Sequence, residues 1–374
     1  EQKIYSNMNL SLHYGKDLKV TMTGYKIKFN GVDRLYDDYS WRLTRRAKAV
    51  WESGNLLQGK YLKELEQAVA KKYNRKYAVG VGSATDGLYF AMKSVGITKN
   101  SMVVCPAFSY IATAGAIKRL GADIHYVDTD ANGNIGDWQG QGLPDGVVYV
   151  NMFGNPADYN RLRKYCHSHH IPLIEDAAQS QGASHGKLVS GALGDVSVFS
   201  FDPMKNMPSF GGGGMVLTDS KEVHDNVISL RRHGMSGKHT YGYNSLISED
   251  HANQLLFLLK KFDRLQSMRD KVCRRYKNNL PEVQMICAGP DTKSSNHKLV
   301  ILVERRDELK AYLETKGIET KIHYSRTLDA GHTGQYPEAE RLCAMALSLP
   351  IYPHLKMKEV DFVCAEIKEF LYVR

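Results

Sequence analysis

The chain has 374 residues, 43% of them hydrophobic, and a formal net charge of +10. This composition predicts a globular protein of two or three domains and argues against a disordered or fibrous chain. The diffuse positive charge suits small anionic ligands as readily as nucleic acid, but no basic stretch is interleaved with aromatics for base stacking, so we expect no nucleic-acid partner. The sequence shows neither a run of roughly 18 apolar residues nor a signal-peptide pattern, so we expect a cytoplasmic protein with no membrane contact.

The N-terminal third begins without a clear pattern. Residues 1–28 have no clear period, and we expect an extension of unknown role there. Apolar residues then recur at helical spacing over 36–57 and again over 61–73, which predicts two amphipathic helices.

From residue 77 the chain alternates between short apolar runs and helical patterns. This alternation predicts an α/β domain with a mainly parallel sheet covered by helices on both faces, within a large domain spanning 29–248. A smaller α+β domain is expected over 249–374. The strands predicted for the large domain are 77–81, 102–105, 124–127, 147–151, 171–175, 196–201 and 215–218; the smaller domain should contain helices 251–280, 306–316 and 358–372 and strands 297–303 and 319–323.

Ligands of such sheets bind beyond the carboxyl ends of the strands, so the residues at those positions are candidates for function. Ser83, Ala84 and Thr85 form a small-residue turn between a strand and a helix, which suits either an anion site or an ordinary helix cap. Tyr110 begins the next helix, where its ring could cover a ligand or pack in the core.

An acid and a lysine stand at the ends of two successive strands. Asp176 ends the run IPLIED, and Lys205 follows the run VSVFSF and precedes four glycines. A carboxylate and an amine at one edge of a sheet are the groups that a protein needs to hold a pyridine cofactor carrying an aldehyde.

Two segments resemble metal sites but lack a complete ligand set. Asp128–Gln139 nearly matches a calcium loop, yet Gln139 stands where a bidentate Glu is required, so a polar surface loop is predicted. The cluster Cys166–His170 has no second ligand pair and is expected to be a helix end. Six scattered cysteines predict reduced thiols. We therefore expect no metal site.

Eight segments, in this order, resemble the DegT/DnrJ/EryC1/StrS group of sugar aminotransferases: GSATDGL, PAFSYIATAGAIKRLGADIHYVD, NMFGNPAD, IEDAAQSQGA, GDVSVFSFDPMKN, GGGGMV, GYNS and LSLPIYPHL. The resemblance covers about Asp33 to the C-terminus. It implies fold type I, in which a large domain with a mostly parallel, seven-stranded sheet is followed by a smaller α+β domain. It also implies pyridoxal 5′-phosphate (PLP) as cofactor.

The resemblance assigns roles around the cofactor ring. Lys205 corresponds to the lysine that forms a Schiff base with the aldehyde, and Asp176 to the carboxylate that faces the pyridine nitrogen. Gln179 would lie near the phenolic oxygen, while Ala178 and Tyr110 would cover the two ring faces.

The resemblance also implies how the phosphate and the substrate are bound. Ser200 would bind the phosphate together with the backbone of Ala84 and Thr85, and Asn244 would reach it from the neighbouring subunit of a homodimer. His323, Tyr324 and Arg326 would approach the substrate.

Three departures from the family pattern affect the substrate pocket more than the cofactor. Asp202 replaces an aromatic or His, Gly211–Gly214 lacks an acidic residue, and Leu246 replaces a frequent arginine. The expected activity is amination of a keto-sugar, in nucleotide-linked form, with glutamate as amino donor. A free keto-sugar acid or a cyclitol ketone is the alternative acceptor, and a non-catalytic regulator is the third interpretation.

Overall fold

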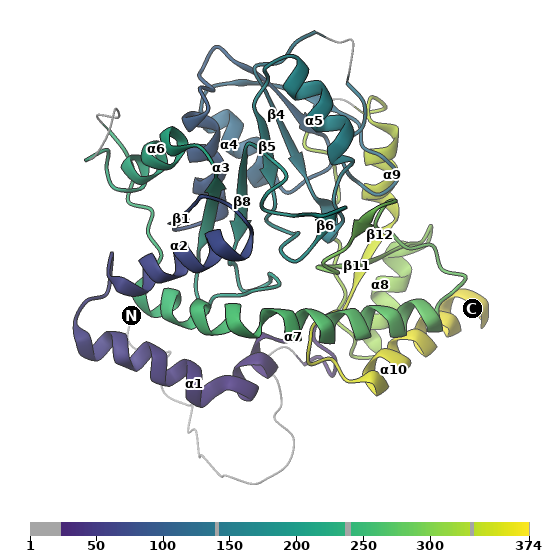
Figure 1. The fold of residues 1–374 in the computed structure, drawn as a ribbon. Helices are drawn as coiled ribbons and strands as arrows, with labels where there is room; N and C mark the ends of the chain where they lie inside the picture. The colour runs from purple at the N-terminus through teal and green to yellow at the C-terminus, as the bar shows by residue number, and fades with distance from the viewer. Residues whose placement is uncertain (1–23, 139–141, 236–240, 330–332, 374) are drawn as a thin grey trace, which may run out of the picture.

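The large domain is built on a seven-stranded sheet in this computed structural model, which describes residues 24–138, 142–235, 241–329 and 333–373 (Figure 1). The strand order is β1-β9-β8-β5-β4-β2-β3. All neighbours are parallel except β9, which is antiparallel to both β1 and β8. The predicted fold class is confirmed. The strands are β1 (Tyr77–Val81), β2 (Met102–Pro106), β3 (Asp123–Val127), β4 (Gly146–Val150), β5 (Leu173–Asp176), β8 (Val196–Ser200) and β9 (Gly214–Thr218).

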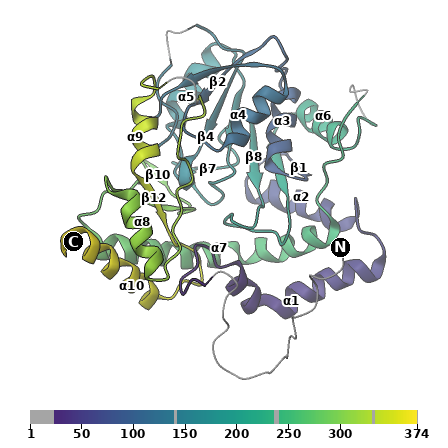
Figure 2. The same cartoon turned by 180° about the vertical axis from the view of Figure 1, so that it is seen from behind.

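Helices cover both faces of this sheet, as Figures 1 and 2 show from opposite sides. Alternate residues of each strand point to opposite faces, so Val198 packs with one set of helices and Phe199 with the other. The Val198 face is covered by α3 (Ala84–Ser94), α4 (Ile111–Arg119) and α6 (Lys221–Arg231). The other face is covered by α1 (Val32–Ser53), α2 (Lys60–Lys72), α5 (Tyr159–Ser168) and α7 (Glu249–Asn279).

The smaller domain pairs two antiparallel strands, β11 (Leu299–Leu302) and β12 (Ala346–Leu349). The 31-residue helix α7 runs beneath both domains and contributes to the core of each. A further apolar cluster that contains Phe108 and Val300 joins the two domains. The remaining elements are α8 (Arg306–Thr315), α9 (Pro337–Met345), α10 (Met357–Lys368), the π-helical turn Glu369–Val373, the 3₁₀ turn Met152–Gly154, and the short strands β6 (Ser184–His185), β7 (Leu188–Val189) and β10 (Thr292–Lys293).

The predicted strand over 319–323 is wrong, and two elements of the smaller domain were not predicted. Only Lys321 pairs with β12, through an isolated bridge to Ser348, while the N–H of Glu319 donates to Ile27 at 2.9 Å. Because its hydrogen bonds go to two different partners, this segment forms no continuous ladder. The second strand of the smaller sheet is β12, and α9 precedes it.

The described part of the predicted N-terminal extension packs against the smaller domain. Ile27 is 4% exposed and lies in that domain's core. Its N–H donates to the carbonyl of Gly317 at 3.0 Å, and its backbone bridges to Ile318. Residues 1–23 lie outside the described residues.

The loop after β3 has a structural role. The carboxylate of Asp128 accepts hydrogen bonds from the N–H groups of Glu338 and Ala339, at 3.0 and 2.8 Å, and so caps α9 of the other domain. Trp138 is 1% exposed, so the loop is anchored in the core, which differs from the predicted surface loop. Gln139 lies outside the described residues.

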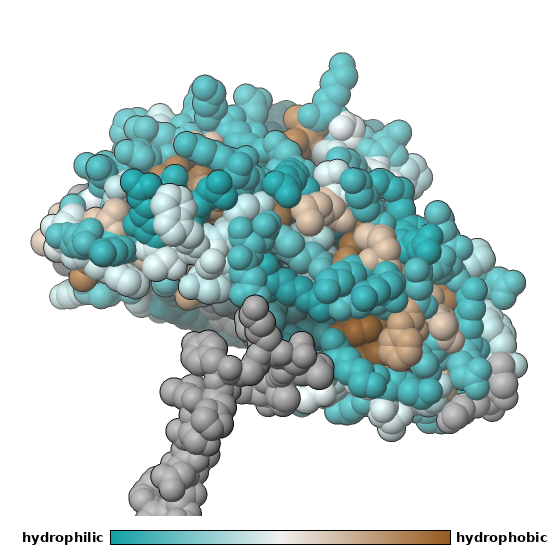
Figure 3. Space-filling view, turned by 90° about the horizontal axis from the view of Figure 1, so that it is seen from below, coloured by the Kyte–Doolittle hydropathy of each residue, from teal (hydrophilic) through white to brown (hydrophobic). Residues whose placement is uncertain are grey.

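The cluster Cys166–His170 lies at the C-terminal end of α5, as predicted, and Cys166 is buried. All six cysteines are free. In the described ranges, no three His, Cys, Asp or Glu side chains are grouped to hold a metal, and no helix is both long and apolar enough to span a membrane. The face of the molecule seen from below is largely hydrophilic, with separated hydrophobic patches (Figure 3).

Candidate active site

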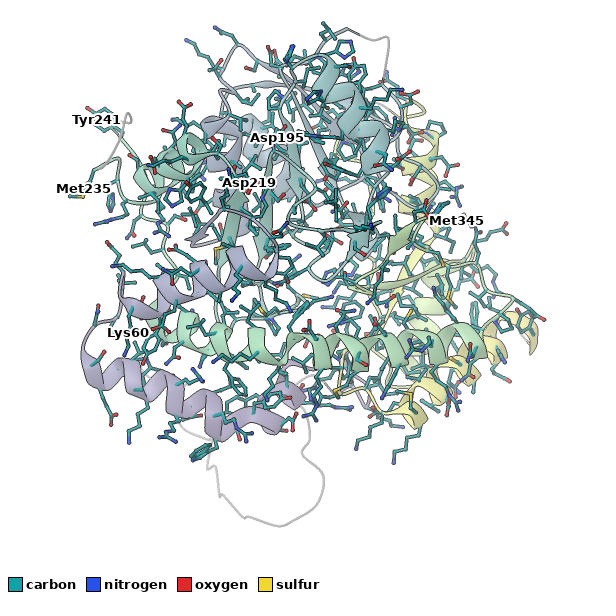
Figure 4. The ribbon with its side chains drawn as sticks, viewed as in Figure 1. Lys60, Asp195, Asp219, Met235, Tyr241 and Met345 are labelled. Carbon is teal, nitrogen blue, oxygen red and sulfur yellow. The ribbon has the colours of Figure 1, made fainter. Side chains whose placement is uncertain are left out.

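The carboxyl ends of the parallel strands meet at one rim of the sheet. Ser83 follows β1, Asp176 ends β5 and Ser200 ends β8, while the antiparallel β9 starts at this rim, opposite Ser200. Asp195 and Asp219, labelled in Figure 4, mark the opposite end of the sheet. A cavity of about 360 Å³ opens at the rim, between the large domain and the smaller one. The predicted residues that line it are Ser83, Ala84, Thr85, Tyr110, Asp176, Ala178, Gln179, Ser200, Lys205, His323 and Tyr324.

Asp176 is a buried carboxylate held by two hydrogen bonds. Its Oδ2 accepts from the Thr113 hydroxyl at 2.9 Å, and its Oδ1 accepts from the Ala178 N–H at 3.1 Å. Burial raises the pKa of Asp176, and these two donors and the Lys205 amine oppose that rise. A protonated pyridine nitrogen placed against this carboxylate would offset the cost of its burial.

The preceding residue, Glu175, points to the opposite face of β5 and is fixed by donors on three other segments. Its carboxylate accepts from Asn151 Nδ2 at 2.8 Å, from the Ser190 hydroxyl at 2.7 Å and from the Ser197 hydroxyl at 2.6 Å. Because the strand alternates, fixing Glu175 on one face also fixes the direction of Asp176 on the other. Glu175 therefore has a structural role, whereas Asp176 faces the cavity.

Lys205 lies in the turn that follows β8, within the same cavity. Burial lowers the pKa of its amine, while the negative charges of Asp176 and Asp202 oppose that change. A lowered pKa increases the fraction of neutral amine, which is the form that attacks a carbonyl or accepts a proton. The next residue anchors the turn to the other domain, because Asn206 Nδ2 donates to the Ser295 carbonyl at 2.9 Å.

The start of α3 forms an anion-binding cradle. Ser83 caps this helix, and its hydroxyl accepts from the Asp86 N–H at 3.1 Å. The N–H groups of the first helical turn have no partner within the helix, and the helix dipole favours a negative charge there. A Cβ at Gly214 would lie 2.7 Å from the Ala84 nitrogen, so β9 approaches this turn closely enough to require glycine. Ser200 is buried beside it at 7% exposure.

With this geometry established, comparison with known proteins identifies the family. A model of the DegT/DnrJ/EryC1/StrS aminotransferase family matches residues 40–368. The chain belongs to this family. It is a transaminase and, like its family, it uses PLP as cofactor. The buried carboxylate of Asp176 suits the pyridine nitrogen of that cofactor, and the Lys205 amine of lowered pKa suits its aldehyde. The cradle at α3 suits its phosphate.

Two relatives and one solved structure show how widely the similarity extends. The aminotransferase is 32% identical to a pleiotropic regulatory protein of Geobacillus stearothermophilus, over 90% of this chain and 96% of that one. It is 29% identical to a dTDP-3-amino-3,4,6-trideoxy-alpha-D-glucose transaminase of Streptomyces venezuelae, over 92% and 96%. A crystal structure of S. venezuelae DesV in complex with a ketimine intermediate covers 92% of this chain and 98% of its own, with 29% identity and a TM-score of 0.87.

Gln179 is held between the two domains of the aminotransferase. Its Oε1 accepts from the Phe153 N–H at 3.1 Å, and its Nε2 donates to the Tyr324 hydroxyl, also at 3.1 Å. Tyr324 comes from the smaller domain and packs edge-on against Phe108. A predicted cofactor residue and a predicted substrate residue are thus linked directly. Tyr110, at the mouth of the cavity, is 61% exposed.

Two predicted site residues lie outside the cavity of their own chain. Asn244 is exposed, and its backbone bridges to Arg232 after α6. Arg326 is also exposed and does not line the cavity. The roles expected for both stay predictions.

Three residues of the site were not predicted from the sequence. Thr113 lies in α4, one turn after Tyr110, and a polar residue within the apolar first two turns of that helix was the available signal. His297 and Lys298 line the cavity from the smaller domain. Two basic residues immediately before an apolar strand are a weak signal, because such positions are commonly exposed.

Proposed function

We propose that this aminotransferase converts a nucleotide-linked keto-sugar to the corresponding amino sugar, with glutamate as the amino donor. The observation that carries the proposal is that Lys205, Asp176 and the Ser83–Thr85 cradle line one cavity. The substrate class rests on the family and on the relative from S. venezuelae, whose name describes a dTDP-linked amino sugar.

Each group in the cavity has a defined task in this proposal. PLP, when bound, supplies an aldehyde that accepts an amino group and a ring that withdraws electrons from the reacting carbon. Asp176 keeps a proton on the pyridine nitrogen. The Lys205 amine removes the proton from the donor carbon that carries nitrogen, and in the second half of the reaction it returns a proton to the former ketone carbon. Ser200 and the α3 cradle hold the phosphate in place.

The smaller domain completes the cavity on the substrate side. We propose that His323 and Tyr324 contact the keto-sugar, since both line the cavity from the smaller domain. Burial and the positive charges of Lys298, Lys205 and Lys321 lower the pKa of His323 to about 3, so its imidazole is neutral at physiological pH. A neutral imidazole can both accept and donate a hydrogen bond, which suits a sugar hydroxyl.

We also propose a homodimer in which Asn244 binds the phosphate of the partner's active site. Its neighbour Tyr243 makes a hydroxyl–hydroxyl hydrogen bond of 2.9 Å with Tyr89 of α3, the helix whose first turn forms the cradle. Asn244 is therefore held in a fixed place relative to α3 while its own side chain is exposed. The proposal includes a cytoplasmic location, which the free cysteines support.

The test is an acceptor panel assayed with L-glutamate and analysed by mass spectrometry. Nucleotide-linked 3-keto and 4-keto sugars are compared with free keto-sugar acids and cyclitol ketones. We expect the highest kcat/KM with a nucleotide-linked substrate. A preference for a ketone without a nucleotide would replace this proposal with the alternative acceptor class.

A further inference from the structure

A group of basic side chains lies where the smaller domain closes the cavity. Lys298, immediately before β11, lines the cavity together with Lys205. His297 is fixed elsewhere, because its Nδ1 is 3.0 Å from Asn206 Oδ1. The buried Nε2 of His323 has no hydrogen-bond partner among the described residues. The smaller domain therefore presents an amine and an imidazole nitrogen whose polar contacts are incomplete.

Lys298 differs from the neighbouring lysine because it has no counter-ion among the described residues. Its ammonium lies 4.7 Å from the centre of the Phe29 ring, which Lys321 approaches at 5.6 Å. Lys321 forms an ion pair with Glu319 at 3.4 Å, whereas no carboxylate of the described chain lies within ion-pair distance of Lys298. Ammonium groups in partly enclosed sites usually have such a partner, because each carries three donors and a full charge.

The electrostatic surroundings of Lys298 also favour a bound anion. Burial lowers the pKa of Lys298 well below its usual range, the positive charges of Lys205, Arg269 and Lys321 lower it further, and Asp202 opposes them. A bound anion would offset both the burial and the repulsion. The cradle at α3 is already suited to a phosphate, so the second anion must belong to a substrate.

The position of Lys298 limits which substrate anion it can meet. Lys298 and Lys205 line the same cavity, and the positive charge of Lys205 helps to lower the pKa of Lys298. Lys205 must reach the carbon that exchanges its amino group, so an anion at Lys298 lies near that carbon. In an amino acid donor the α-carboxylate is bonded directly to it, whereas the diphosphate of a nucleotide-sugar begins at the anomeric oxygen.

We propose that Lys298 is a specificity-determining residue that binds a substrate carboxylate next to the reacting carbon. This inference rests on the proposed function and deepens it. The carboxylate has two possible sources, which are the α-carboxylate of the amino donor and the carboxylate of a keto-sugar acid. A phosphate-linked sugar without an acid group does not provide it.

The variants follow from this assignment. Lys298→Met removes the charge and retains most of the length of the side chain, whereas Lys298→Arg retains the charge and should rescue binding. Lys321→Met is the matched control, because Lys321 lies on the same Phe29 ring but does not line the cavity. Thermal unfolding of each holoenzyme checks folding, and Lys298→Gln replaces the Met variant if that variant does not fold.

The donor is tested in single-turnover reactions of PLP-loaded enzyme with L-glutamate. If Lys298 binds the α-carboxylate, K298M should raise the concentration for half-maximal rate at least about tenfold, as expected for loss of a charged hydrogen bond, with the limiting rate within about threefold. K298R and K321M should stay within about threefold of the wild type. With L-isoglutamine, in which an amide replaces the α-carboxylate, wild type and K298M should differ by less than about threefold.

The acceptor is tested with a nucleotide-linked 3-keto sugar in two forms, one with a carboxylate and one with a hydroxymethyl group on the ring. A loss of at least about tenfold in kcat/KM for the acid form alone would identify the acceptor as the source of the carboxylate. Unchanged values in both experiments, with wild type active, would overturn the assignment of Lys298. Failure of the wild type to react with L-glutamate would instead overturn the proposed function.

Discussion

Removal of the Thr113 hydroxyl should slow transamination without altering the shape of the site. Thr113→Val keeps the side-chain volume and deletes the donor that lies 2.9 Å from Asp176 Oδ2. A hydrogen bond to a charged group contributes about 1.5–3 kcal/mol, and each 1.36 kcal/mol of transition-state stabilisation is a factor of ten. We expect kcat/KM for the glutamate half-reaction to fall by roughly 10- to 150-fold.

Loss of the Thr113 hydroxyl should also change how the rate depends on pH. Thr113 opposes the rise that burial causes in the pKa of Asp176, so its loss raises that pKa further. Asp176 must be ionised to hold the pyridinium, and the acidic limb of the pH–rate profile should therefore move to higher pH. Single-turnover absorbance measurements over a pH series follow both the rate and the limb.

Two variants serve as controls for Thr113→Val. Thr113→Ser keeps the hydroxyl and should restore most of the rate. Ser109→Ala removes the hydroxyl that lies 2.9 Å from that of Thr113, so it perturbs Asp176 only indirectly and should cost less. A Thr113→Val enzyme with a rate and pH profile within about twofold of the wild type would refute the role of this hydrogen bond.

Three further predictions concern the cofactor, the acid stability and the dimer. Gly214→Ala should weaken PLP binding in fluorescence titrations, because its Cβ would meet the Ala84 backbone. Gly115→Ala, which has open space around it, should bind PLP normally and gain about 0.5–1 kcal/mol of helix stability. Equal PLP affinities of the two variants would contradict the role of the cradle. The pKa of His323 is lowered to about 3 in the folded chain, so between that pH and the ordinary pKa of histidine the unfolded chain binds one more proton than the folded chain. The free energy of unfolding should therefore fall as pH falls, and in denaturant titrations between pH 6 and 4 the His323→Gln variant should lose about 1 kcal/mol less per pH unit than the wild type. An equal loss in both proteins would count against the buried imidazole. Mixing Lys205→Ala with Asn244→Ala subunits should regenerate activity if Asn244 acts across the dimer interface, and no recovery despite proven subunit exchange would reject it.

The cofactor side of the site could be predicted because each of its residues lies in a short motif next to a strand end. The sheet brings strand ends together at one rim, so Asp176 and Lys205 meet once the parallel order is inferred. The four glycines also gain a partial physical explanation. A side chain at Gly211 would collide with the His251 ring, and one at Gly214 with the backbone of Ser83 and Ala84.

The substrate side could not be predicted to the same degree because it depends on contacts between the domains. Lys298 has only a weak local signal of function, and its place in the cavity results from the packing of β11 against the large domain. Similarly, β12 could not be predicted from its own four residues, because its pairing partner β11 is distant in sequence. Long-range pairing of this kind leaves little trace in periodicity.

The central claim, that Lys205 and Asp176 form the catalytic pair of a transaminase, is tested most directly by the stoichiometry of a single turnover. PLP-loaded wild type mixed with excess L-glutamate, without an acceptor, should release one equivalent of 2-oxoglutarate per chain. Lys205→Ala, loaded with the same amount of PLP, should release it at least about a thousand times more slowly, since it lacks the amine that moves the proton. Release at the wild-type rate by that variant would contradict the account.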